Sequence, residues 1–155
     1  MVEDMEDYGI KELKDGITLE DLERDYPWIL KADIKDAVIG EEDGILIWYD
    51  GTWKKGLWKK GIWEQGTWEG GTWKRGTWEG GSWEGGIWYE GNWKDGIWED
   101  GTWKDGVWEQ GTWKDGTWQY GIWKDGTWED GKIYDGKKYV RSEINPKKFF
   151  SNIED

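Results

Sequence analysis

The chain has 155 residues, and its 18 Trp and 25 Gly beside only two Phe and two Met describe a core unlike that of an ordinary globular domain. It contains no Cys and no His, which excludes disulfides, thiol nucleophiles, Cys/His zinc sites and imidazole catalysis. The net charge of −13 would repel nucleic acid, so we expect no nucleic-acid partner.

The N-terminal region, residues 1–44, is not repetitive and carries most of the acidity: residues 1–50 hold 16 acidic and 5 basic side chains. Its first residues, Met1 to Asp7, are acidic and lead into no apolar run, so no secretory signal peptide is visible. No stretch has the roughly 18 apolar residues that a transmembrane helix needs. We therefore expect the protein in the cytoplasm of the producing cell or in an assembled particle, with no membrane partner.

Two elements are predicted within this region, which we interpret as a small α/β cap. Thr18 precedes an apolar pattern and is followed three residues later by Asp21, which predicts a capped short helix that Pro27 ends. Residues 29–39 are rich in β-branched side chains and predict one or two short strands. An acidic turn follows at residues 40–44.

The array, residues 45–135, repeats Gly-x-Trp-x-x in five-residue register from Trp48 to Trp128. The position before Trp is mostly β-branched, and the position after it is almost always Lys, Glu, Gln or Tyr. A strand such as Thr102-Trp103-Lys104 therefore shows Trp on one face and solvent-tolerant side chains on the other. The array is predicted to be all-β.

Two arrangements of these strands are open. The Asp-Gly and Gly-Gly turns are typical of type I′ hairpins, although the seven turns with other residues before Gly fit that turn poorly. A meander of decapeptide hairpins also keeps like charges apart, whereas a four-sided solenoid of 20-residue coils would stack Lys94 on Lys114. We predict stacked or meandering hairpins with a Trp core, and keep a β-solenoid with five-residue sides as the alternative.

Three resemblances accompany these patterns. The segments Tyr49–Gly56 and Tyr89–Gly96 resemble the opening of a MORN repeat, a β-hairpin unit. Residues 32–39 are similar to two pentapeptide repeats, which form four-sided β-helices, and this supports the solenoid alternative. The whole chain is similar to Trp-rich Gly-x-Trp repeat proteins of unknown function from tailed phages of cyanobacteria, a resemblance that implies no activity.

The Trp face must be covered, because an exposed row of such rings would far exceed the apolar patch that soluble monomers tolerate. We expect it to form the core. The alternative is an exposed ladder that binds carbohydrate or another extended ligand, and the candidate binding residues are Trp93, Trp98, Trp103, Trp108 and Trp113.

Other chemistry has little support. Asp95, Asp100, Asp105, Asp115 and Asp125 lie in successive turns, where calcium-binding rolls place ligands, but they lack the glycine-rich frame of those rolls. We interpret them as turn formers and expect no metal and no cofactor. No acidic residue stands apart from the repeating columns, so we expect no enzyme.

The last region, residues 136–155, contains Tyr139, Phe149 and Phe150 and is predicted to cap the array. The sequence thus predicts a non-enzymatic structural or protein-interaction repeat module, whose partner is another protein or a second copy. Carbohydrate binding is the alternative function. A third is an acidic decoy or inhibitor that acts through residues 20–25 and 41–43.

Overall fold

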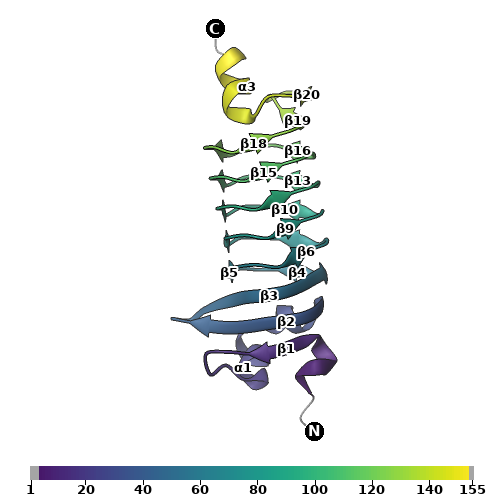
Figure 1. The fold of residues 1–155 in the computed structure, drawn as a ribbon, viewed down its shortest axis with the longest axis vertical. Coiled ribbons are helices and arrows are strands. Elements are labelled where there is room, and N and C mark those ends of the chain that lie inside the picture. The colour runs from purple at the N-terminus through teal and green to yellow at the C-terminus, as the bar shows by residue number, and fades with distance from the viewer. Residues whose placement is uncertain (1–3, 154–155) are drawn as a thin grey trace.

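The computed structural model describes residues 4–153 and shows an elongated parallel β-solenoid between two caps, with the chain ends at opposite ends of the rod (Figure 1). Residues 1–3 and 154–155 of the two predicted caps lie outside the described residues. The prediction of a nearly all-β repeat array with a Trp core is confirmed. The order of the strands decides between the two arrangements that the sequence left open.

The N-terminal cap contains short helices and two strands. Its elements are η1 (Met5–Tyr8), β1 (Ile10–Leu13), α1 (Leu19–Asp25), α2 (Pro27–Leu30) and β2 (Asp33–Glu42). Strand β1 pairs parallel with β2, which pairs antiparallel with β3 (Ile45–Lys55). The cap therefore continues into the first strand of the array. The two long strands β2 and β3 close the N-terminal end of the array (Figure 1).

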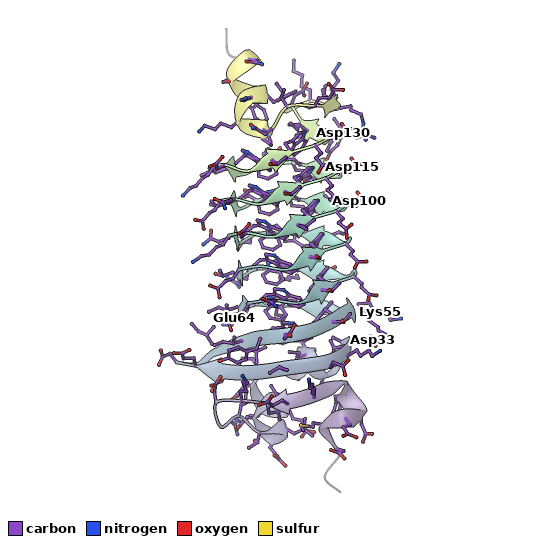
Figure 2. All side chains as sticks on the ribbon, viewed as in Figure 1. Asp33, Lys55, Glu64, Asp100, Asp115 and Asp130 are labelled. Carbon is purple, nitrogen blue, oxygen red and sulfur yellow. The ribbon has the colours of Figure 1, made fainter. Side chains whose placement is uncertain are left out.

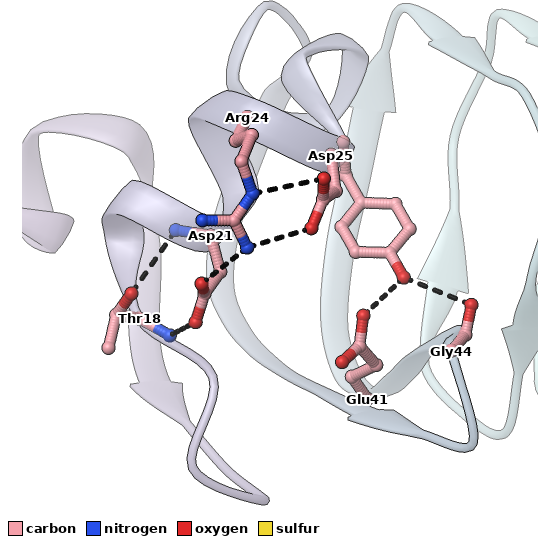
Figure 3. A network of polar contacts seen from close by, with 7 residues as sticks. Thr18, Asp21, Arg24, Asp25, Glu41 and Gly44 are labelled. Carbon is pink, nitrogen blue, oxygen red and sulfur yellow. Dashed lines mark hydrogen bonds and ion pairs between the residues drawn. The ribbon is translucent and has the colours of Figure 1, made fainter.

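The predicted helix cap is confirmed at α1. The Thr18 side chain accepts a hydrogen bond from the Asp21 amide, and the Asp21 carboxylate accepts one from the Thr18 amide. Arg24, three residues after Asp21, forms ion pairs with Asp21 and with the adjacent Asp25 (Figure 3). These hydrogen bonds to the carboxylate lower the pKa of Asp21.

Tyr26 ties the end of this helix to the β2–β3 turn. Its hydroxyl donates to the Glu41 carboxylate and contacts the Gly44 carbonyl oxygen at 3.1 Å (Figure 3). Burial, followed by the bond to Glu41, raises the pKa of Tyr26 to about 12. The acidic stretch of residues 41–43 is thus partly occupied in holding the cap together.

The array winds as a solenoid with fifteen residues per coil. Ile47 pairs with Ile62 and Ile62 with Thr77, in parallel register, and the same step recurs along the chain. Its short strands are β4 (Leu57–Trp58), β5 (Ile62–Trp63), β6 (Thr67–Trp68), β7 (Thr72–Trp73), β8 (Thr77–Trp78), β9 (Ser82–Trp83), β10 (Ile87–Trp88), β11 (Asn92–Trp93), β12 (Ile97–Trp98), β13 (Thr102–Trp103), β14 (Val107–Trp108), β15 (Thr112–Trp113), β16 (Thr117–Trp118), β17 (Ile122–Trp123) and β18 (Thr127–Trp128).

Three pentads per coil give the rod three faces. Face 1 stacks β3, β5, β8, β11, β14 and β17; face 2 stacks β3, β6, β9, β12, β15 and β18. Face 3 stacks β4, β7, β10, β13, β16 and β19 (Gly131–Tyr134). The long strand β3 crosses from face 1 to face 2, because it contains both Trp48 and Trp53.

The hairpin arrangement is corrected by this topology, since the repeat strands β4 to β18 pair with one another in parallel. A type I′ turn needs positive φ at both central residues. In the array only the Gly has it, and the residue before Gly does not; Gly96, for example, has φ of 123°. The Asp of an Asp-Gly turn instead accepts a hydrogen bond from the Gly amide, as Asp95 does at 2.8 Å.

The solenoid with five-residue sides is therefore the arrangement adopted, but with three sides instead of four. This also resolves the charge problem. When the sign alternates every pentad, an odd number of pentads per coil places opposite charges in neighbouring coils. Lys94 thus lies between Glu79 and Glu109 in the stack of face 1.

The core consists of three columns of stacked indole rings, and every Trp from Trp48 to Trp118 is 0% exposed. Trp83 shows the pattern: it stacks on Trp68 and Trp98 at 4.7 and 4.8 Å between ring centroids. It also meets Trp78 and Trp88 edge-on at 5.9 Å. Each ring is covered by its own column and by the two neighbouring columns.

Both ends of these columns are closed. At the base Trp28 of α2 packs its ring against Trp58, with centroids 5.2 Å apart. At the top Ile133 of β19 replaces Trp in the third column and is fully buried. Strand β20 (Tyr139–Ser142) pairs antiparallel with β19, and α3 (Pro146–Ile153) lies over the end of the rod (Figure 1).

Candidate functional site

The five tryptophans of the expected binding ladder lie inside the rod. Trp93, Trp98, Trp103, Trp108 and Trp113 are 0% exposed, and each stacks between the rings of the coils below and above. A ligand on the outside of the solenoid would not touch their rings. The outer surface, and not the Trp columns, must therefore carry any interaction of this chain.

That surface is built from two outward columns on each face, the residues before and after each Trp. On face 1 the column after Trp is Tyr49, Glu64, Glu79, Lys94, Glu109 and Lys124, and on face 2 it is Lys54, Glu69, Glu84, Glu99, Lys114 and Glu129. On face 3 it is Lys59, Lys74, Tyr89, Lys104, Gln119 and Tyr134, and neither column of face 3 holds an acidic residue. Face 3 is therefore basic in a chain that is acidic as a whole.

We call Lys59, Lys74 and Lys104 the basic row. Lys59 and Lys74 occupy neighbouring coils, since β4 pairs directly with β7. The corner beside them repeats this like-charge order with Lys60 and Arg75. Among the described residues, none of these five cations lies within ion-pair distance of a carboxylate.

Aromatic side chains interrupt and end the basic row. The ammonium groups of Lys74 and Lys104 lie 5.8 and 5.0 Å from the centroid of the Tyr89 ring, which they approach from neighbouring coils. At the C-terminal end Tyr134 contacts Tyr120 and Tyr139, with ring centroids 5.6 and 5.0 Å apart. A pocket of about 320 Å³ adjoins them, lined by Trp118, Gln119, Tyr120, Gly121, Tyr134, Asp135, Gly136 and Phe150.

We call Glu69, Glu84 and Glu99 on face 2 the acidic row. They occupy three successive coils, because β6 pairs with β9 and β9 with β12. Burial, and then the charges of Glu99 and Glu69, raise the pKa of Glu84. The two rows stand on adjacent faces at the same position of the pentad.

The aspartates considered as calcium ligands are distributed over three corners of the rod. Asp95 and Asp125 share one corner, Asp100 and Asp115 the next, and Asp105 lies on the third. Asp100, Asp115 and Asp130 do run along one edge (Figure 2), but Arg141 contacts Asp115 and Asp130 at 3.4 and 2.9 Å. Within residues 4–153, no group of three or more acidic side chains has the arrangement of a metal site.

In the part of the chain that the structure describes, no helix is long and apolar enough to span a membrane. The comparisons with family models, with characterised proteins and with solved structures find no match for this chain. The resemblance to phage-encoded Gly-x-Trp proteins therefore stays a prediction. The candidate site is defined by the chain's own geometry: a basic face beside an acidic one.

Proposed function

We propose that this protein is a non-enzymatic structural module that works through the charged faces of a rigid rod. The observation that carries the proposal is the complete burial of the Trp columns, which commits every Trp of the repeat to packing. Parallel stacking in three columns leaves Lys, Glu, Asp and Thr side chains on the outer surface, together with the exposed Tyr89, Ile97, Tyr120 and Ile122. Such a surface suits contact with another protein.

A ring of hydrogen bonds around each coil supports the structural part of this proposal. The amide after each Trp donates to the carbonyl of the Trp one coil below, as Glu99 does to Trp83 at 2.7 Å. The amide before each Trp donates to a Gly carbonyl of that coil, as Ile97 does to Gly81 at 2.9 Å. Each pentad is thus hydrogen-bonded twice to the coil below it, and in such an array stability accumulates from the contacts between neighbouring repeats.

Trp fluorescence tests the proposal against the carbohydrate alternative. Buried rings predict a blue-shifted native emission that acrylamide quenches poorly, and no spectral change when soluble neutral or acidic polysaccharides are added. Denatured protein provides the exposed reference. A red-shifted native spectrum, or a change of emission on adding polysaccharide, would contradict the structural role of the Trp columns.

A further inference from the structure

The order of charges differs between the two halves of the rod. From Lys94 onward the residues after Trp alternate in sign along faces 1 and 2, as in Glu99, Lys114 and Glu129. After Lys54, which lies in the first coil of face 2, the charges are instead sorted by face, with Lys59 beside Lys74 on face 3 and Glu69 beside Glu84 on face 2. Like charges in adjacent strands are unfavourable, so this sorting calls for a compensating partner.

The basic and acidic rows fall on the same repeat, although Tyr89 leaves a gap of one coil between Lys74 and Lys104. Both are set by the rise of one coil, which is the separation of neighbouring strands, about 4.8 Å. Two rods of this protein that lie side by side therefore bring Lys59 and Lys74 of one copy opposite two successive glutamates of the other. Another partner would need charges with that same repeat, whereas a second copy has it by construction.

We propose that face 3 of one copy docks against face 2 of a second copy, with the basic row opposite the acidic row. This inference deepens the proposed function and rests on it. Face 2 is the better complement because its three glutamates are consecutive, whereas Lys94 interrupts the acidic column of face 1 after Glu79.

The geometry fixes the kind of assembly. The two contacting surfaces differ, so the contact is heterologous, and it leaves face 2 of the first copy and face 3 of the second free for further copies. Six coils of about 4.8 Å and a side of five residues of about 3.3 Å give a face of roughly 29 by 16 Å. A contact of this size is at the weak end of specific interfaces. Association should be reversible, open-ended and sensitive to salt.

Sedimentation velocity of the full chain over a range of protein concentrations tests the proposal. We expect concentration-dependent association at about 0.01 M salt that weakens about tenfold or more at about 1 M salt, where the Debye length falls from about 30 Å to about 3 Å. A chain that stays monomeric at low salt, even at the highest concentration, would overturn the proposal and leave the structural role of the Trp columns untouched.

Charge-reversal variants test whether face 3 and face 2 are the surfaces in contact. The variant Lys59→Glu, Lys74→Glu, Lys104→Glu should lose association, and so should Glu69→Lys, Glu84→Lys, Glu99→Lys. The two variants mixed should associate again, because each supplies the row that the other lacks. Near-UV circular dichroism confirms that each variant keeps the Trp columns.

A matched control carries the same change in net charge away from faces 2 and 3: Lys94→Glu and Lys124→Glu on face 1, with Lys11→Glu in the N-terminal cap. It should associate at least tenfold more strongly than the face 3 variant. An equal loss of association in the control and in the face 3 variant would show that net charge alone is responsible, and would overturn the proposal. A mixture of the face 2 and face 3 variants that stays monomeric would also overturn it. Binding of a nucleic-acid duplex by a monomeric parent would assign the basic row to a different partner.

Discussion

Tryptophan suits this core because the distance at which indole rings stack equals the rise of the coil. Trp68 and Trp83 are 4.7 Å apart between centroids, and strands in a sheet are about 4.8 Å apart. The indole nitrogens are not equivalent, however. Trp83 donates to the Asp100 carbonyl at 3.1 Å, whereas the buried nitrogen of Trp78 has no hydrogen-bond partner among the described residues.

This difference predicts unequal costs for one substitution at two neighbouring sites. Trp83→Phe and Trp78→Phe both leave a cavity in a fully buried column, so each should cost several kcal/mol. Trp83→Phe should cost about 1 kcal/mol more, because it also leaves the Asp100 carbonyl without its donor. Urea unfolding measures both variants, and an equal or reversed ranking would contradict the assigned hydrogen bond.

The second residue of a Gly-Gly turn must be glycine, whereas the first can be replaced by a larger residue. Gly71 has φ of 109°, and a Cβ there would lie 2.4 Å from the Gly56 carbonyl oxygen. A Cβ on the adjacent Gly70 would lie 3.6 Å from its nearest neighbour. Gly71→Ala should therefore destabilise by about 3 kcal/mol or more, and Gly70→Ala by less than about 1 kcal/mol. Thermal unfolding of the pair decides this; equal losses would argue against the stacked glycine corners.

At the scale of the elements, partial burial of Glu84 and then the charges of Glu99 and Glu69 give the rod a distinct pH dependence. Glu84 has a raised folded pKa, so its contribution to stability is fully present below the ordinary value of 4.5 and is lost as the pH rises through the raised value. Glu84→Gln should therefore be more stable than the parent at neutral pH, by about 0.3 kcal/mol for so exposed a group. The advantage should vanish below pH 4.5, as measured by urea unfolding at low protein concentration.

The sequence predicts the strands, the inward Trp, the outward charges and the Thr18 cap because these follow from a period of two or from local hydrogen bonds. The number of pentads per coil does not follow from any single pentad. Asp-Gly supports a hairpin when it is considered alone, while turns such as Lys55-Gly56 and Arg75-Gly76 disagree with it. These exceptions, together with the ten-residue alternation of charge, fit a coil with an odd number of sides.

The candidate site also could not be located without knowing the number of pentads per coil. Lys74 lies fifteen residues after Lys59 and Lys104 lies thirty residues after Lys74, and a fifteen-residue coil places all three on one face. With twenty residues per coil the three would be dispersed over different faces. The sequence therefore contained the basic and acidic rows, but they could be recognised only once the coil length was known.

In the molecule as a whole, the buried Trp columns provide stability, and the charged faces provide the surface for contacts. The interior is nearly identical from coil to coil, so stability should accumulate from neighbour contacts along the rod. The caps protect its ends: Trp28 covers the first ring triangle, and the Trp128 indole donates to the Ser142 carbonyl at 2.9 Å. The faces are then free to vary in charge without disturbing the core.

The coil length can be measured directly, because the chain has no natural cysteine. Three pairs of cysteines share position 97: Ile97/Thr112, fifteen residues apart; Ile97/Lys104, which a hairpin would bring together; and Ile97/Thr117, twenty residues apart. Ile97 and Thr112 are partners in neighbouring strands, within reach of a disulfide. Under mild oxidation only Ile97→Cys with Thr112→Cys should form an intramolecular disulfide while Trp emission stays native. Efficient cross-linking of either other pair in the folded protein would contradict the three-sided solenoid.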